Sequence, residues 1–196
     1  MLAIFLDLET TGLDFRKHSV VELACKIVDI STGNTLAAYQ SIVKQPFDKW
    51  ENRDLASIAV NGFTWEMLAD GKEEALISSE IIQLFTDLDI QRGKAVFICQ
   101  NPAFDKGFFT QLVNVYTQEQ LNWPYHWLDF ASMYWALLTQ QARKLGEPFP
   151  SQLNLSKNEI AKRYQLPPEQ HPHRAMNGVD HLILCYSTVV GMGEEE

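Results

Sequence analysis

The sequence predicts an α/β fold in which a mixed five-stranded sheet carries helices on both faces. Three apolar runs near the N-terminus are separated only by short turns, which is typical of an antiparallel meander. Helical patterns then alternate with two more apolar runs, which is typical of strands joined in parallel by helices. With 196 residues and 46% hydrophobic residues, we expect a single domain at 1–191, followed by a short acidic tail at 192–196.

The individual elements follow from the spacing of the apolar residues and from turn residues between them. The strands are expected at 2–8, 19–29, 36–43 and 94–99, with Tyr125–Leu128 as the best candidate for the fifth. The helices are expected at 54–58, 64–69, 73–88, 103–116, 129–145, 155–164 and 179–190.

Two acids, Asp7 and Glu9, stand on alternate residues where the first predicted strand meets a turn. Residues two apart on a strand project from the same face, so the two carboxylates should lie together. They repel each other unless a cation lies between them, and such hard oxygen ligands suit Mg²⁺ or Mn²⁺. The pair therefore predicts a metal site, and the alternative is a strand that ends in solvent with two exposed acids.

Two further polar groups stand at predicted helix starts. Asp105 follows the turn Asn101-Pro102 and falls in the first turn of a helix, where an acid also simply complements the helix dipole. Near the C-terminus, three of the five histidines, His171, His173 and His181, crowd the start of the last predicted helix. A histidine in such a place is structural or solvated in most proteins, so the cluster is notable only beside the acids.

Together these segments resemble the DEDDh 3′–5′ exonucleases, the family of ribonuclease T, oligoribonuclease and the proofreading subunit of bacterial DNA polymerase III. The resemblance rests on three motifs in order: D-x-E-T-T-G at 7–12, N-x-x-F-D at 101–105 and H-R-A at 173–175. It extends from residue 2 to about residue 190. It implies a ribonuclease H-like fold, which agrees with a meander followed by alternating helices and strands.

The resemblance also implies catalytic roles. Asp7, Glu9, Asp105 and a C-terminal aspartate would hold two Mg²⁺ or Mn²⁺ ions, and His173 would be the general base that takes a proton from the attacking water. The expected reaction is hydrolysis of phosphodiester bonds at the 3′ end of single-stranded DNA or RNA.

Substrate-binding residues are expected around the first turn and two other segments. The backbone around Thr10 and Thr11 would hydrogen-bond the 3′-hydroxyl, and Leu13 would wedge against the terminal base. Asn101 belongs to the second motif. Phe63 and Trp65, in a segment similar to the family's H-G-I-T, are candidates for stacking on bases.

The sequence departs from the family at its last aspartate, which normally stands five residues after the histidine. That position is Gly178, and the nearest aspartate is Asp180. Asp180 serves as the fourth ligand if the glycine delays the start of the helix. In an unbroken helix, Asp180 would instead face away from the metals, and Gly178→Asp should raise activity. The alternative function in that case is a catalytically impaired nucleic-acid-binding or interaction module.

The composition restricts the binding mode, the cellular compartment and the partners that we expect. The net charge of −9 argues against broad coating of nucleic acid and favours weak, end-directed binding. Three cysteines in apolar segments predict buried free thiols in a reducing compartment, and hence a cytoplasmic protein. No apolar stretch approaches the length of a membrane span, so no membrane partner is expected. The family resemblance makes a homodimer possible.

Overall fold

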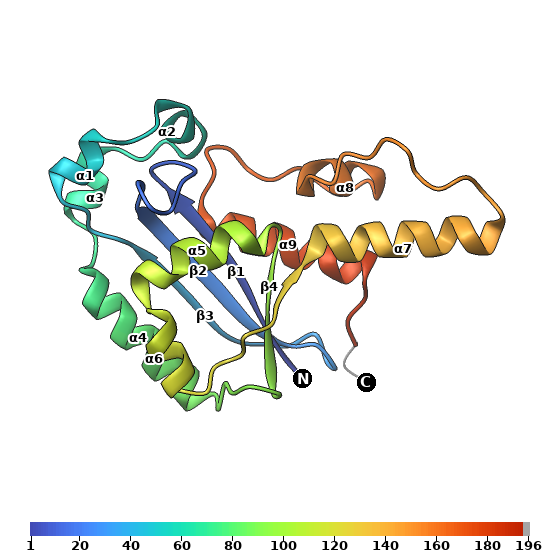
Figure 1. The fold of residues 1–196 in the computed structure, drawn as a ribbon, viewed down its shortest axis with the longest axis horizontal. Coiled ribbons are helices and arrows are strands. Elements are labelled where there is room, and N and C mark those ends of the chain that lie inside the picture. The colour runs from blue at the N-terminus through green and yellow to red at the C-terminus, as the bar shows by residue number, and fades with distance from the viewer. Residues whose placement is uncertain (194–196) are drawn as a thin grey trace.

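The computed structural model describes residues 1–193, which fold around a five-stranded sheet of order β3-β2-β1-β4-β5 (Figure 1). The first three strands pair antiparallel, whereas β4 is parallel to β1 and β5 is parallel to β4. The strands are β1 (Leu2–Thr10), β2 (Val20–Asp29), β3 (Thr35–Ile42), β4 (Ala95–Cys99) and β5 (Trp127–Asp129). The predicted α/β fold class, with a mixed five-stranded sheet, is confirmed.

Helices cover both faces of the sheet (Figure 1). They are α1 (Phe47–Glu51), α2 (Leu55–Asn61), α3 (Trp65–Ala69), α4 (Glu74–Asp87), α5 (Pro102–Leu112), α6 (Val115–Gln120), α7 (Phe130–Leu145), α8 (Lys157–Arg163) and α9 (Ala175–Val189). Side chains alternate along β1, so Ile4 and Leu6 pack toward α4 and α5, while Ala3 and Phe5 pack toward α9. Asp7 and Glu9 continue this second set, which directs both acids toward the start of α9.

Two predicted helices differ most from the structure in their bounds. The helix expected at 103–116 divides into α5 and α6 because Val113 is extended and the Asn114 side chain caps α6 by accepting from the Tyr116 and Thr117 amides. The last helix begins at Ala175 and not at 179. Gly178 lies within the helix, and its amide donates to the carbonyl oxygen of Arg174 at 3.0 Å.

Residues 190–193, which follow α9, belong to no helix or strand. Of the acidic tail predicted at 192–196, residues 194–196 lie outside the described residues. None of the helices in residues 1–193 combines the length and the apolar character that crossing a membrane requires.

Candidate active site

Three acids meet at one edge of the sheet. Asp7 and Glu9 end β1, and β4 runs parallel to β1, so the helix that follows β4 begins at the same edge and carries Asp105 there. The side chains of Glu9 and Asp105 are buried, whereas Asp7 is partly open to a cleft of about 380 Å³. The structure thus brings together three of the acids that the motifs single out.

Burial and mutual repulsion make these acids hold protons more tightly than usual. Burial raises the pKa of Asp7 to about 7, against the attraction of Lys157. Burial raises the pKa of Glu9 to about 8, and repulsion from Asp7 adds to this effect. The pKa of Asp105 lies well above its ordinary value for the same two reasons. Such a set is costly to ionise without a cation.

The chemistry of these donors fits a divalent metal ion. Carboxylate oxygens that are desolvated and mutually repelling are the hard ligands that Mg²⁺ and Mn²⁺ prefer. Within residues 1–193, no three acidic, histidine or cysteine side chains already surround a common point as metal ligands. The acids are therefore gathered at one place, and their final arrangement around an ion would require side-chain rotation.

His173 lies at the rim of the same cleft. Its backbone amide donates to the carbonyl oxygen of Val60 at 3.2 Å, which holds the segment before α9 against α2. Its side chain is 25% exposed, and Nδ1 lies 3.9 Å from Oε1 of Glu169. Burial lowers the pKa of His173, so the imidazole is neutral near pH 7 and able to accept a proton.

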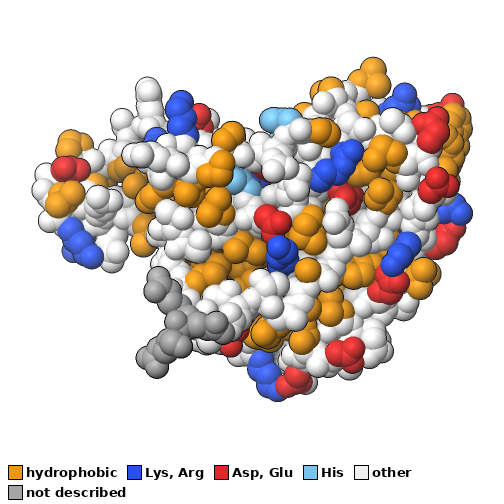
Figure 2. Space-filling model, turned by 180° about the vertical axis from the view of Figure 1, so that it is seen from behind, with side chains coloured by type: hydrophobic (Ala, Val, Ile, Leu, Met, Phe, Trp, Pro, Cys, Tyr) orange, Lys and Arg blue, Asp and Glu red, His pale blue; other side chains and the backbone are white. Residues whose placement is uncertain are grey.

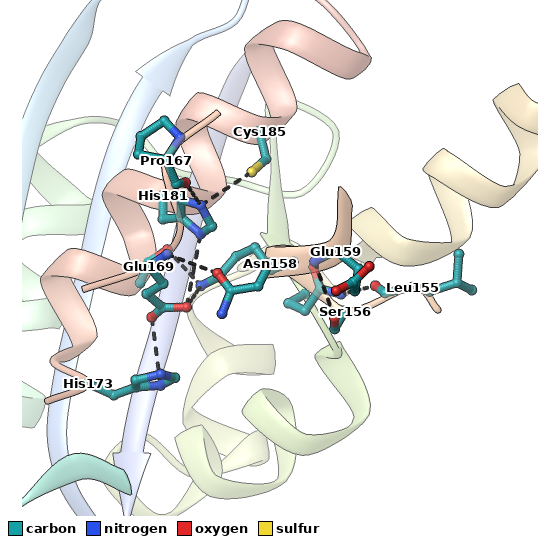
Figure 3. A network of polar contacts seen from close by, with 12 residues as sticks. Leu155, Ser156, Asn158, Glu159, Pro167, Glu169, His173, His181 and Cys185 are labelled. Atoms are coloured by element: carbon teal, nitrogen blue, oxygen red, sulfur yellow. Dashed lines mark hydrogen bonds and ion pairs between the residues drawn. The ribbon is translucent and has the colours of Figure 1, made fainter. Parts of the chain in front are cut away.

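Two buried charges in the cleft, Glu169 and Lys157, are absent from the predicted site. They form an ion pair at 3.0 Å, and Lys157 Nζ also donates to the carbonyl oxygen of Gly178 at 3.0 Å. Figure 3 shows the Glu169 carboxylate between the rings of His173 and His181. Neither residue stands in a motif, but the lack of an aspartate at 178 was a signal to look for another acid.

The structure does not bring Asp180 to the other acids. Because α9 is regular from Ala175 onward, two residues beyond Gly178 correspond to a rotation of ~200° about the helix axis. The Asp180 side chain is 51% exposed and pairs with Lys26 on β2. Gly178 is the residue that faces Asp7, so the expectation that Asp180 joins the ligands is corrected by the register of α9.

Gly178 leaves no room for a side chain. A Cβ atom at this position would lie 1.9 Å from Oδ2 of Asp7 and 2.7 Å from its Cγ. The helix conformation itself favours alanine over glycine by ~1 kcal/mol, so any loss of function would come from the displaced carboxylate. This close approach also argues against a simple gain of activity from Gly178→Asp.

We therefore expect Gly178→Ala to lower turnover by at least about tenfold, since a shift of ~1 Å in a reacting group has effects of that order or larger. Turnover of a labelled oligonucleotide and Mn²⁺ affinity would be measured together. Asp180→Ala, on the exposed face of the same helix, is the matched control. Wild-type turnover in Gly178→Ala would show that the position of Asp7 is not restricted by α9.

The predicted substrate-binding residues divide into two groups. Leu13, 73% exposed, and Thr10 line the cleft, as does Phe104, which was not predicted. The Thr10 hydroxyl donates to the Gly12 carbonyl oxygen, and the Thr11 hydroxyl accepts from the Ser19 amide, so both shape the turn.

The other predicted substrate residues lie elsewhere. Asn101 is exposed at the start of α5, outside the lining of the cleft. Phe63 is only 2% exposed, packs in a small apolar cluster and is covered by the guanidinium of Arg174, 4.4 Å from the ring centre. Trp65 packs edge-on against Phe47. Both aromatic rings serve packing here and are not presented to the cleft.

Comparisons with known proteins agree with this fold. Residues 4–183 match the family described as Exonuclease. The structure superposes on Escherichia coli exonuclease I bound to a dT13 oligonucleotide with a TM-score of 0.73 and 20% identity, covering 96% of this chain and 41% of that one. A zinc-bound complex of the E. coli enzyme with single-stranded DNA gives a TM-score of 0.74 and 19% identity, covering 95% of this chain and 40% of that one.

A third similar structure is a moderately thermophilic exonuclease I from Methylocaldum szegediense, with a TM-score of 0.71, 19% identity, and coverage of 95% of this chain and 40% of that one. This chain thus spans well under half the length of the exonuclease I chains. A comparison with curated protein sequences finds no match.

The family match covers most of the chain, so the chain belongs to the exonuclease family. The predicted membership of the exonuclease family is confirmed.

Proposed function

We propose that this domain removes nucleotides from the 3′ end of single-stranded nucleic acid in a metal-dependent hydrolysis. The observation that carries the proposal is the cleft itself, which Asp7, Glu9 and His173 help to line, with Asp105 buried and interacting with Asp7. The oligonucleotide complexes of exonuclease I make single-stranded DNA the first substrate to test.

Asp7, Glu9 and Asp105 would hold Mg²⁺ or Mn²⁺, two ions in the full site. The bound metal would stabilise negative charge on the scissile phosphate and lower the pKa of the attacking water. The acids contribute by being desolvated, because a low local dielectric strengthens each interaction with a cation.

His173 would take the proton of the attacking water. Its lowered pKa keeps the ring neutral at neutral pH, and its partial exposure leaves a path along which the proton reaches solvent. Glu169, facing Nδ1, would stabilise the imidazolium that forms on proton transfer.

The substrate grip would be local. On the face shown in Figure 2, Lys and Arg side chains are interspersed with Asp and Glu and form no continuous basic patch. Leu13 and Phe104 supply apolar surface in the cleft on which a terminal base could rest, at ~1–3 kcal/mol for a stacked aromatic contact. Such a site would bind ends and would not coat long strands.

A second candidate is a nucleic-acid-binding module with impaired catalysis. Gly178 favours it, because α9 offers no fourth carboxylate, and the buried Lys157 already supplies positive charge beside Glu169. The two candidates differ in turnover and not in binding.

The test uses a single-stranded DNA and a matched RNA oligonucleotide, each 5′-labelled. We expect stepwise shortening from the 3′ end with Mg²⁺ or Mn²⁺ and none with EDTA, because the acids cannot stabilise the scissile phosphate alone. Equal shortening in EDTA would contradict the metal dependence. End binding without shortening under any metal would favour the second candidate.

A further inference from the structure

Glu169 lies, together with Asp7, against the side of α9 on which Gly178 has no side chain. A Cβ atom built at Gly178 would lie 1.9 Å from Oδ2 of Asp7 and 3.1 Å from Oε1 of Glu169. Both oxygens therefore lie within 3.1 Å of the one point from which an aspartate side chain at 178 would project. The carboxylate of Glu169 reaches this region from the segment 164–174, which precedes α9.

The two oxygens of the Glu169 carboxylate have different neighbours. The side chain of Glu169 is 6% exposed, and Oε2 is paired with Lys157 at 3.0 Å. Oε1 accepts no hydrogen bond from residues 1–193, and its contact with His173 Nδ1 is 3.9 Å long. Glu169 is one of the residues that line the cleft, so a cation in the cleft could approach Oε1.

The backbone around Glu169 fixes this orientation. Its amide donates to the side-chain oxygen of Asn158 in α8 at 2.9 Å, as Figure 3 shows. Lys157, the neighbour of Asn158, bridges to the Gly178 carbonyl oxygen. The start of α8 thus ties Glu169 and α9 together, so the carboxylate is placed by several contacts and not by chance packing.

We propose that Glu169 replaces the missing fourth carboxylate and holds a divalent cation together with Asp7. This inference rests on the proposed metal-dependent activity. Lys157 neutralises Glu169 when the cation is absent, and Asp180 takes no part. The site then keeps four carboxylates, although the fourth comes from a different segment of the chain.

The rival explanation is that Glu169 is only the counter-ion of Lys157. Removing one partner of a buried ion pair destabilises a protein because the other charge is left uncompensated. Glu169→Gln alone therefore does not separate the two explanations. The double variant Glu169→Gln/Lys157→Met removes both charges with side chains of similar size, so it tests the metal role without an orphaned ammonium group.

The experiment is calorimetric titration of Mn²⁺ into wild type, Glu169→Gln, the double variant and Asp180→Asn, with thermal unfolding to confirm that each is folded. We expect both Glu169 variants to lose at least about tenfold in the affinity of one Mn²⁺, and Asp180→Asn to match wild type. Wild-type affinity in the double variant would overturn the inference while leaving the proposed function intact. No Mn²⁺ binding by wild type would overturn the proposed function and this inference with it.

Discussion

Asp7→Asn is expected to abolish exonuclease turnover, with a loss of at least about 10³-fold, or several kcal/mol of transition-state stabilisation. Asp7 is the acid that interacts with Glu9, Asp105 and Glu169, so its loss removes the carboxylate common to all of them. The measurement is the rate of oligonucleotide shortening at saturating Mg²⁺. Asp180→Asn, which removes the same charge from an exposed position, should keep wild-type turnover.

The same substitution should stabilise the metal-free domain at pH 8. The pKa of Asp7 is raised from 3.8 to about 7 in the folded state, so its contribution to stability is fully present below pH 3.8 and is lost as the pH rises through 7. Glu9, with a pKa of about 8, acts with the same sign. In EDTA, the melting temperature of wild type should therefore fall between about pH 4 and pH 8.

Asp7→Asn lacks this titration and should melt higher than wild type at about pH 8, by ~2–4 °C for each kcal/mol gained. Thermal unfolding in EDTA at acidic and alkaline pH measures the difference. A lower melting temperature for Asp7→Asn at alkaline pH would show that the Asp7 carboxylate stabilises the apo fold. Retained turnover in the variant would contradict its role as a metal ligand.

Sequence patterns predicted the strands and the position of Asp7 and Glu9 on one face because both depend on local information. The β1 strand is a continuous apolar run, and the alternation of side chains on it places Asp7 and Glu9 on one face. Parallel pairing of β4 with β1 then places Asp105 at the same edge. The first relation follows from strand geometry alone, whereas the pairing of β4 with β1 joins segments distant in sequence and was predicted only as part of the fold class.

The rest of the site depends on contacts between segments far apart in sequence. The register of α9 is fixed by packing of Val179 and Leu182 on the sheet, so a glycine that favours a loop in isolation is helical here. Glu169 and Lys157 meet only because α8 docks beside α9. Phe63 was predicted to stack on bases, but a lone aromatic residue carries no sign of whether its ring faces core or cleft.

His173→Ala is expected to lower turnover by ~10²–10⁴-fold, the range for loss of a general base. The effect should fall on the chemical step, because Glu169, the acid that His173 faces, is held by Lys157 and by the bond from its amide to Asn158. Mn²⁺ affinity should therefore stay close to that of wild type. Single-turnover rates at saturating metal measure the loss directly.

The matched control for this residue is His171→Ala. His171 is exposed, and its ring centre lies 4.6 Å from that of His173, so both substitutions change the same patch of surface. Of the two histidines, only His173 lines the cleft, where it can reach the attacking water. It also faces Glu169, whose carboxylate would stabilise the protonated ring. We expect His171→Ala to be mild and added imidazole to restore part of the activity of His173→Ala. If His171 proved essential and His173 dispensable, the general base would have been assigned to the wrong histidine.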